Sequence, residues 1–328
     1  MTGIVRKAVI TAAGRGTRQY PASSAVQKEM FPLVDRDGLT KTVIQIIGEE
    51  AIRAGCEQIC LVTQPGDEKL YTDYFQGMTD ETFAAFKDKP WAIEAADHLA
   101  DFGRRLHFVS QDSPEGYGHA VHQAREFVGD EPFLHLLGDH VYIAAAARNC
   151  AQQLIDVFDA GGFDAVTAVQ PTPEHLLHLF GTVRGRGIEG RADAWTVDAI
   201  EEKPRPEHAR EHLRTPGLSA GQYLCHFGMH VFPPSIFEAL GHHIGRDIRV
   251  NGEIQLTNAQ EFMRTELLGG DRYGACAIAG RRFDTGIPYG LMETQIGLAL
   301  AGRHRGEIVE SIALLLAEHL APVARKQG

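Results

Sequence analysis

Residues 7–35 read KAVITAAGRGTRQYPASSAVQKEMFPLVD, and this stretch decides the fold class. Its first seven residues form the kind of apolar run that makes a buried strand, and the run passes directly into Gly14 and Gly16. Glycines in that place let backbone N–H groups approach an anion closely, and Arg15 and Arg18 add fixed positive charge. The stretch predicts a strand leading into an anion-binding loop, although a plain turn without a ligand can have the same composition.

Two common nucleotide-binding loops do not fit this stretch. The Rossmann fingerprint needs a third glycine where the chain has Gln19, and an acid at the end of the second strand, where it reads LVTQPGD (61–67). The missing glycine argues against an NAD(P)-dependent oxidoreductase. A P-loop needs its lysine directly after the glycines, whereas Lys28 stands ten residues past Arg18.

Apolar segments alternate with helix-like segments from this stretch to about residue 170. The predicted strands cover 57–63, 105–110, 132–142 and 163–170, and the predicted helices cover 40–55, 67–75, 118–128 and about 145–160. In the first helix we expect Thr40 as the N-cap and Gly55 at the end. Such β-α-β alternation is typical of a parallel sheet with helices on both faces.

The rhythm changes after residue 170. Short strands are predicted at 180–184, 194–200 and 222–232, a helix within 252–267, a strand or strand pair at 272–284, and helices at 290–303 and 306–321. The expected fold class is α/β, with a Rossmann-like mixed, mainly parallel sheet, helices on both faces and a small α+β elaboration. The helix at 306–321 has enough leucine and isoleucine to serve either an interface or the core.

Composition excludes several classes of protein. The 328 residues are 44% hydrophobic with a net charge of −11, and no Lys/Arg run suggests a nucleic-acid binder. No apolar stretch is long enough to span a membrane, and no signal peptide is evident. The five cysteines are scattered, which favours reduced thiols in the cytoplasm over a zinc site. His226 and His230 lie in a strand-like segment, so their spacing does not predict a metal site.

The glycine loop is similar to the signature loop of the nucleoside triphosphate–sugar-1-phosphate nucleotidyltransferases, and its KEMFPLVD version looks most like that of bacterial UTP–glucose-1-phosphate uridylyltransferases. Further segments resemble the family in the family's order: QDSPEGYGHAV (111–121), FLHLLGDHVY (133–142), EEKP (201–204), NGEIQLTNA (251–259) and GRRFDTGIPYGLMET (280–294). The resemblance implies the sugar nucleotidyltransferase fold as one domain over 1–328. Its parts would be a nucleotide-binding half (1–170), a sugar-binding half (171–303) and a C-terminal helix (304–328).

The chemistry of that family explains the residue types. A sugar 1-phosphate oxygen attacks the α-phosphorus in line and expels pyrophosphate, so positioning and charge neutralisation do most of the catalysis. One charge pair at ~4 Å is worth about 4 kcal/mol at an effective dielectric of 20. The resemblance implies catalytic roles for Arg18, Lys28 and Asp139, nucleotide binding by Ala12, Ala13, Gly14, Gly16, Gln111 and Gly116, sugar-phosphate binding by Gly181, Glu202 and Lys203, and Mg²⁺ binding by Asp139 and Asp284.

Several positions depart from the family pattern. Thr11 stands where proline is usual, Ser24 where a second lysine is frequent, and His140 where many uridylyltransferases have a second acid; residues 35–42 are longer and more polar than the usual turn. Plainer alternatives also exist, because Asp139 and Asp284 could cap strand ends and Glu202 could be a surface charge.

We expect uridylyl transfer from UTP to glucose 1-phosphate in the cytoplasm, with small molecules as partners and neither nucleic acid nor membrane. Thymidylyl transfer stays open because uracil and thymine differ by one methyl, which is worth ~1–3 kcal/mol of discrimination. A catalytically silent nucleotide-sugar-binding homologue and a homo-oligomer also stay open.

Overall fold

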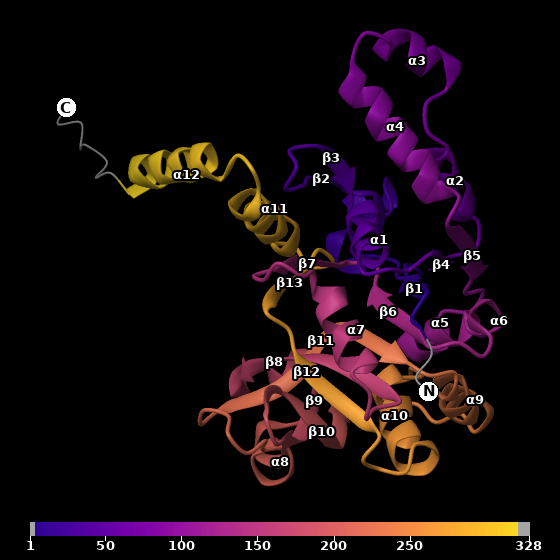
Figure 1. Cartoon of the computed structure of the whole chain (residues 1–328), viewed down its shortest axis with the longest axis vertical. Helices are drawn as coiled ribbons and strands as arrows, with labels where there is room; N and C mark the ends of the chain where they lie inside the picture. Colours follow the sequence, from indigo (N-terminus) through magenta and orange to yellow (C-terminus); the bar gives the residue numbers. More distant parts are fainter. Residues whose placement is uncertain (1–3, 321–328) are drawn as a thin grey trace.

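The computed structural model describes residues 4–320, which surround a nine-stranded sheet with the order β5-β4-β1-β6-β11-β8-β12-β10-β9 (Figure 1). Its strands are β1 (Lys7–Thr11), β4 (Gln58–Thr63), β5 (Leu106–Ser110), β6 (Phe133–Leu137), β8 (Ala165–Pro173), β9 (Gly181–Ile188), β10 (Arg191–Glu202), β11 (Gln222–Phe232) and β12 (Tyr273–Ala277). Strands β5, β4, β1 and β6 pair in parallel, and β12 is parallel to β8. Strand β11 runs antiparallel to β6 and β8, and β10 runs antiparallel to β9 and β12. The predicted mixed α/β sheet is confirmed, but the sheet is not mainly parallel, because the strands added after residue 170 pair mostly antiparallel.

Two small sheets lie outside the main sheet. Strand β2 (Pro32–Val34) pairs with β3 (Thr40–Thr42), and β7 (His140–Ala144) pairs antiparallel with β13 (Gly280–Asp284). The prediction of one strand over 132–142 is therefore wrong, because the chain turns between β6 and β7. Gly138 permits this turn: its N–H donates to the Thr11 carbonyl at 2.9 Å, and a Cβ there would lie 2.6 Å from that oxygen.

Helices cover both faces of the main sheet (Figure 1). They are α1 (Val43–Arg53), α2 (Glu68–Phe75), α3 (Asp80–Phe86), α4 (Pro90–Gly103), α5 (Tyr117–Gln123), α6 (Arg125–Val128), α7 (Cys150–Asp159), α8 (Pro206–His212), α9 (Ser235–Gly245), α10 (Leu256–Phe262), α11 (Gly290–Ala301) and α12 (Arg305–Leu320). A π-helical turn, Met263–Leu267, extends α10. The sequence did not predict α3 and α4, which form a projecting arm with α2 (Figure 1).

The first residues of α1 and α7 differ from the predictions, and in both helices the observed start is set by a side chain that caps it. The N-cap of α1 is Thr42, whose Oγ1 accepts from the Gln45 N–H, because β3 covers Thr40–Thr42 and the helix begins only after it. Helix α7 begins at Cys150, where the Asn149 side chain caps it by accepting from the Gln152 N–H at 2.7 Å. Differences of a few residues are usual when helix boundaries are assigned from sequence pattern.

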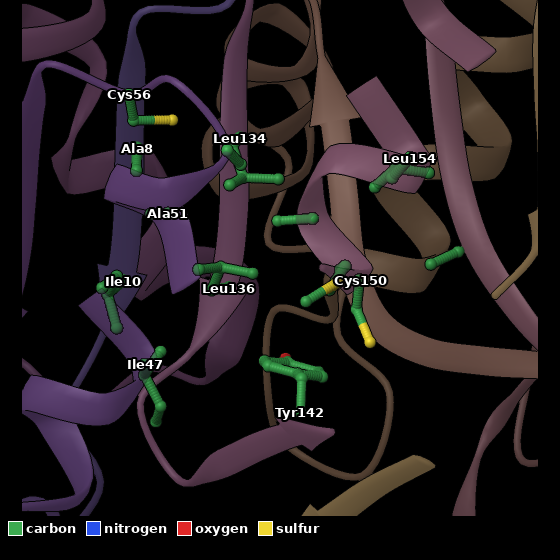
Figure 2. Packing of buried hydrophobic residues seen from close by; sticks show 14 of the residues in the cluster. Ala8, Ile10, Ile47, Ala51, Cys56, Leu134, Leu136, Tyr142, Cys150 and Leu154 are labelled. Carbon is green, nitrogen blue, oxygen red and sulfur yellow. The ribbon is translucent and has the colours of Figure 1, made fainter. Parts of the chain in front are cut away.

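The hydrophobic core lies on both faces of the sheet because side chains alternate along each strand. On one face, Ala8 and Ile10 of β1 pack with Leu134 and Leu136 of β6 against α1 and α7 (Figure 2). On the other face, Val9 packs with residues of α5, α9 and α10. The five cysteines are free and buried, as predicted. Within residues 4–320, no helix is long and apolar enough to cross a membrane.

Helix α12 is the exception to this packing. It projects from the body of the molecule, at the yellow end of the chain (Figure 1), and has no buried residue over its described length. Most of its large apolar side chains are exposed, with Leu315 at 63%. The core alternative for 306–321 is therefore wrong. The rest of the C-terminal segment predicted over 304–328, from residue 321 on, lies outside the described residues.

Candidate active site

A cleft of about 540 Å³ lies at the carboxyl ends of β1, β5 and β6. Most of the residues implied by the resemblance line it: Ala13, Gly14, Arg18, Lys28, Gln111, Gly116, Asp139, Gly181, Glu202, Lys203 and Asp284. Ala12 and Gly16 do not line it. Ala12 is buried, and its N–H donates to the Val62 carbonyl at 2.7 Å, so this amide belongs to the sheet.

The loop after β1 folds back so that its two ends meet. Three short 3₁₀ turns, Thr17–Gln19, Ala22–Ser24 and Lys28–Met30, carry the chain around. Gly16 adopts φ 60°, which favours glycine. A Cβ at Gly14 or at Gly16 would lie 3.4 Å from the Lys28 stem, so both glycines lie directly against this side chain. The length of the loop therefore places Lys28 beside the glycines that precede it.

Lys28 is 7% exposed and is held by two carboxylates. Its Nζ lies 2.6 Å from Glu29 Oε1 and 2.9 Å from Asp139 Oδ2. Burial acts to lower the pKa of Lys28, but the Asp139 and Glu29 carboxylates outweigh it, so this pKa is raised and the ammonium stays charged. Burial raises the pKa of Glu29 to about 7 although Lys28 opposes it. Sequence reasoning missed Glu29, whose only signal was its place beside Lys28.

Asp139, His140 and Asp284 form a cluster that distant segments assemble. Asp139 follows β6, while β7 and β13 pair so that His140 lies opposite Asp284. One potential ligand atom from each of the three residues lies within 4.8 Å of the others. Burial and the neighbouring Asp139 raise the pKa of Asp284. Burial also acts to raise the pKa of Asp139, but Lys28 outweighs it and this pKa is lowered.

Gly286 completes the space around the two carboxylates. Its N–H donates to Asp284 Oδ1 at 2.8 Å, and a Cβ there would lie 2.6 Å from Asp139 Oδ2 and 3.0 Å from Asp284 Oδ1. Any side chain at this position would fill the space in front of both acids. Two carboxylates that converge on an open space are the donor set that a hard divalent cation requires.

The segment from Gln111 to His119 is ordered by its own contacts. Gln111 follows β5, and its Nε2 donates to the Gly116 carbonyl at 3.1 Å and lies 3.1 Å from His119 Nδ1. Gly116 has φ 115°, and a Cβ there would lie 2.7 Å from that of Glu253. His119 therefore positions Gln111 from behind rather than lining the cleft.

The opposite end of the cleft is formed by β9, β10 and β11. Glu202 Oε2 accepts from Thr257 Oγ1 at 2.7 Å, and Glu202 Oε1 lies 3.1 Å from Lys203 Nζ. A Cβ at Gly181 would lie 2.8 Å from His226 Nδ1 and 3.1 Å from Thr257 Oγ1. Sequence reasoning missed Thr257 as a site residue, although it selected the segment 251–259 that contains it.

Arg282 is a cleft residue that the sequence analysis did not identify. Its guanidinium lies over the Phe180 ring at 4.4 Å, and Nη1 donates to the His226 carbonyl at 3.3 Å. Burial lowers its pKa, and Tyr142 and Asp284 partly offset this. In a strand that ends in Asp284, period-two alternation places Arg282 and Asp284 on one face, and this was the signal available in GRRFD.

Comparison with known proteins now decides the family. The nucleotidyl transferase family model matches residues 7–269. A UTP–glucose-1-phosphate uridylyltransferase of Streptococcus pneumoniae is 35% identical over 302 residues, which cover 92% of this chain and 92% of that protein. The chain belongs to the nucleotidyl transferase family.

Further relatives agree with this assignment. A UTP–glucose-1-phosphate uridylyltransferase of Bacillus subtilis is 35% identical over 95% of this chain and 97% of its own. A solved structure of a UTP-bound UGPase from Acinetobacter baumannii superposes with a TM-score of 0.73 at 26% identity, covering 95% of this chain and 99% of that one.

Members of the nucleotidyl transferase family generally use a divalent metal. Asp139 and Asp284 fit such an ion, because their carboxylates converge and Gly286 keeps the space before them open. Asp139 contacts Lys28 through Oδ2, which leaves its Oδ1 without that contact. In this nucleotidyl transferase, one aspartate therefore links the lysine to the cluster of Asp139, His140 and Asp284.

Proposed function

We propose that this nucleotidyl transferase moves a uridylyl group from UTP to glucose 1-phosphate, giving UDP-glucose and pyrophosphate. The proposal rests on one observation: the same cleft is lined by Gln111, by the Lys28–Asp139–Asp284 cluster and by the pair Glu202–Lys203. A nucleotide base, a set of phosphates and a sugar each need one of these three regions. The names of the relatives, uridylyltransferases and a UTP-bound UGPase, support UTP as the donor and glucose 1-phosphate as the acceptor.

In this mechanism an oxygen of the sugar phosphate attacks the α-phosphorus of UTP, and the bond from that phosphorus to the bridging oxygen of pyrophosphate breaks. Lys28 neutralises the charge that develops on the α-phosphate, and exposed Arg18 binds the departing phosphates. No proton has to be removed from the attacking phosphate oxygen. These residues therefore act mainly by positioning the substrates and by neutralising charge.

Recognition of the two substrates is assigned to opposite ends of the cleft. Gln111 and the backbone at Gly116 face the base, where an amide matches the donor and acceptor row of uracil. Glu202 accepts hydrogen bonds from sugar hydroxyls, and Lys203 binds the phosphate of the sugar. Mg²⁺ held by Asp139 and Asp284 would neutralise charge on the nucleotide phosphates when bound.

A pyrophosphate-release screen tests the proposal. UTP, dTTP, ATP, GTP and CTP are each paired with glucose 1-phosphate and other sugar 1-phosphates, with Mg²⁺ or with excess EDTA. We expect the highest kcat/KM for UTP with glucose 1-phosphate and none in EDTA. A higher kcat/KM for another pair would replace the proposed substrates, and no release with any pair would favour the silent homologue.

We also propose a cytoplasmic location, supported by five free, buried thiols. We also propose self-association through α12, because a helix without buried residues receives little stabilisation from packing within its own monomer. Light scattering of the full chain and of a chain with Leu314, Leu315 and Leu316 changed to serine would test it. A monomer at all concentrations would overturn the self-association.

A further inference from the structure

We propose that His140 is a third protein ligand of the divalent ion, and that its imidazole makes the site favour Mn²⁺ over Mg²⁺. The inference rests on the proposed function, because the ion is the one that assists uridylyl transfer. Two acids already account for a metal site, so the question is what the histidine adds.

Geometry brings His140 into the same space as the acids. Its Nε2 lies 3.9 Å from Asp139 Oδ1, the oxygen that Lys28 leaves free. The ligand atoms of Asp139, His140 and Asp284 all lie within 4.8 Å of one another. Ligands on opposite sides of an ion with bonds of about 2.1 Å are about 4 Å apart. The distances between the three ligand atoms thus need to shorten only slightly for all three residues to bind one ion.

The fold gives the His140 ring a fixed place. It is buried on β7, directly opposite Asp284 on β13. Gly228, with φ 89° at an irregularity of β11, makes room for the ring, since a Cβ there would lie 2.5 Å from His140 Nδ1. The Gly228 carbonyl is itself fixed by the Tyr142 hydroxyl, which donates to it at 2.6 Å. A ring held this firmly cannot easily turn away from the acids.

Hydrogen bonding within the protein does not explain why a histidine is here. His140 Nδ1 is buried and has no hydrogen-bond partner among residues 4–320. An unpaired buried polar atom usually costs stability, so a native structure keeps one for a reason. The hydrogen bonds of the described residues therefore do not hold the ring through Nδ1, and ligation of a metal through Nε2 is a reason for a histidine that agrees with the position of both acids.

Ligand chemistry then sets the direction of the selectivity. Imidazole nitrogen suits transition ions, whereas Mg²⁺ prefers an all-oxygen shell. A neutral imidazole in place of a further carboxylate also removes the charge that would favour a hard ion. We therefore expect the ratio of Kd for Mg²⁺ to Kd for Mn²⁺ to be at least tenfold higher here than in His140→Asp.

Electron spin echo spectroscopy of bound Mn²⁺ tests the contact directly, because it detects a coordinated ¹⁴N nucleus. The wild-type chain, His140→Asp, His140→Asn and the control His98→Asn are each measured with and without UTP. His98 is an exposed residue of α4, outside the cleft. We expect nitrogen modulation in the wild type and in His98→Asn and its loss in both His140 variants. Thermal melting identifies any variant that fails to fold.

Absence of nitrogen modulation in the wild type, or its persistence in a folded His140 variant, would overturn the inference. An unchanged ratio of the two dissociation constants in His140→Asp would overturn the selectivity. These outcomes are separable from the proposed function, because pyrophosphate release is measured independently. An active enzyme without the nitrogen signal refutes only His140 ligation, and an inactive protein with that signal refutes only the uridylyl transfer.

Discussion

The two lysines of the cleft are held in opposite ways. Lys28 is 7% exposed and lies between the carboxylates of Glu29 and Asp139. The Lys203 side chain is 49% exposed and has one carboxylate neighbour, Glu202, at 3.1 Å. Burial and two partners fix the first ammonium before any substrate arrives, whereas the second keeps much of its freedom. Under the proposed function, the difference indicates that the end of the cleft at Lys28 is organised for the reaction and the end at Lys203 for binding.

The largest effect is expected from Lys28→Ala. Because a fixed charge acts mainly on the transition state, kcat should fall about 10³-fold, or about 4 kcal/mol, while KM for glucose 1-phosphate changes little. Steady-state kinetics of pyrophosphate release would measure both constants. Lys87→Ala, at an exposed lysine outside the cleft, is the matched control. A kcat within threefold of wild type would remove Lys28 from catalysis and end the contrast between the two lysines.

Asp139→Asn is expected to rank next. It removes a proposed metal ligand and also one of the two carboxylates that hold Lys28, so kcat should fall at least 10²-fold and the half-saturating Mg²⁺ concentration should rise. Asp284→Asn, which leaves the Lys28 contacts in place, should cost less at saturating metal. If Asp284→Asn were the more damaging change, the link between the lysine and the metal cluster would not contribute to catalysis.

The pH dependence of stability tests the burial of Lys28 and Glu29 by a different measurement. The pKa of Glu29 is raised from 4.5 to about 7 in the folded protein, so the folded state holds an extra proton between these values. Linkage then lowers the free energy of unfolding as pH rises from about 4.5 to 7. Glu29→Gln cannot ionise, so its stability relative to wild type should increase over that window by up to about 3 kcal/mol, at 1.36 kcal/mol per pKa unit.

Urea unfolding of both chains at pH 5 and pH 8 would measure this change. Glu57→Gln, at an exposed position away from the cleft, provides the control for a generic loss of one carboxylate. A difference between Glu29→Gln and wild type that stays constant from pH 5 to pH 8 would mean that Glu29 ionises normally and that Lys28 has a less buried environment.

The sequence predicted the parts of the fold that local pattern controls. The apolar run at 7–13 and the alternation that follows predicted the parallel strands, and in the structure Gly14, Gln111 and Asp139 each follow one of them. The turn at Gly138 was missed because the apolar pattern continues through it. What breaks the strand is the close approach of Gly138 to the Thr11 carbonyl, a contact between distant residues.

Side-chain environments were harder to predict than positions. The burial of Arg282 depends on Phe180 and on the His226 carbonyl, which lie in segments distant in sequence. The facing of His140 and Asp284 depends on the register of β7 and β13, which no local pattern contains. Helix α12 shows the converse: its apolar residues predicted a helix correctly, but composition cannot distinguish a buried face from an exposed one.

The smallest effect is expected from Lys203→Ala, because Lys203 is the more exposed of the two lysines. A charge-assisted hydrogen bond contributes about 1.5–3 kcal/mol, and solvent exposure favours the lower part of this range. KM for glucose 1-phosphate should therefore rise about tenfold, while kcat stays within about threefold and KM for UTP is unchanged. Lys203→Arg should recover part of the loss because it keeps the charge. A fall in kcat as large as that of Lys28→Ala would show that the exposed lysine also acts on the transition state, and that burial does not separate the two roles.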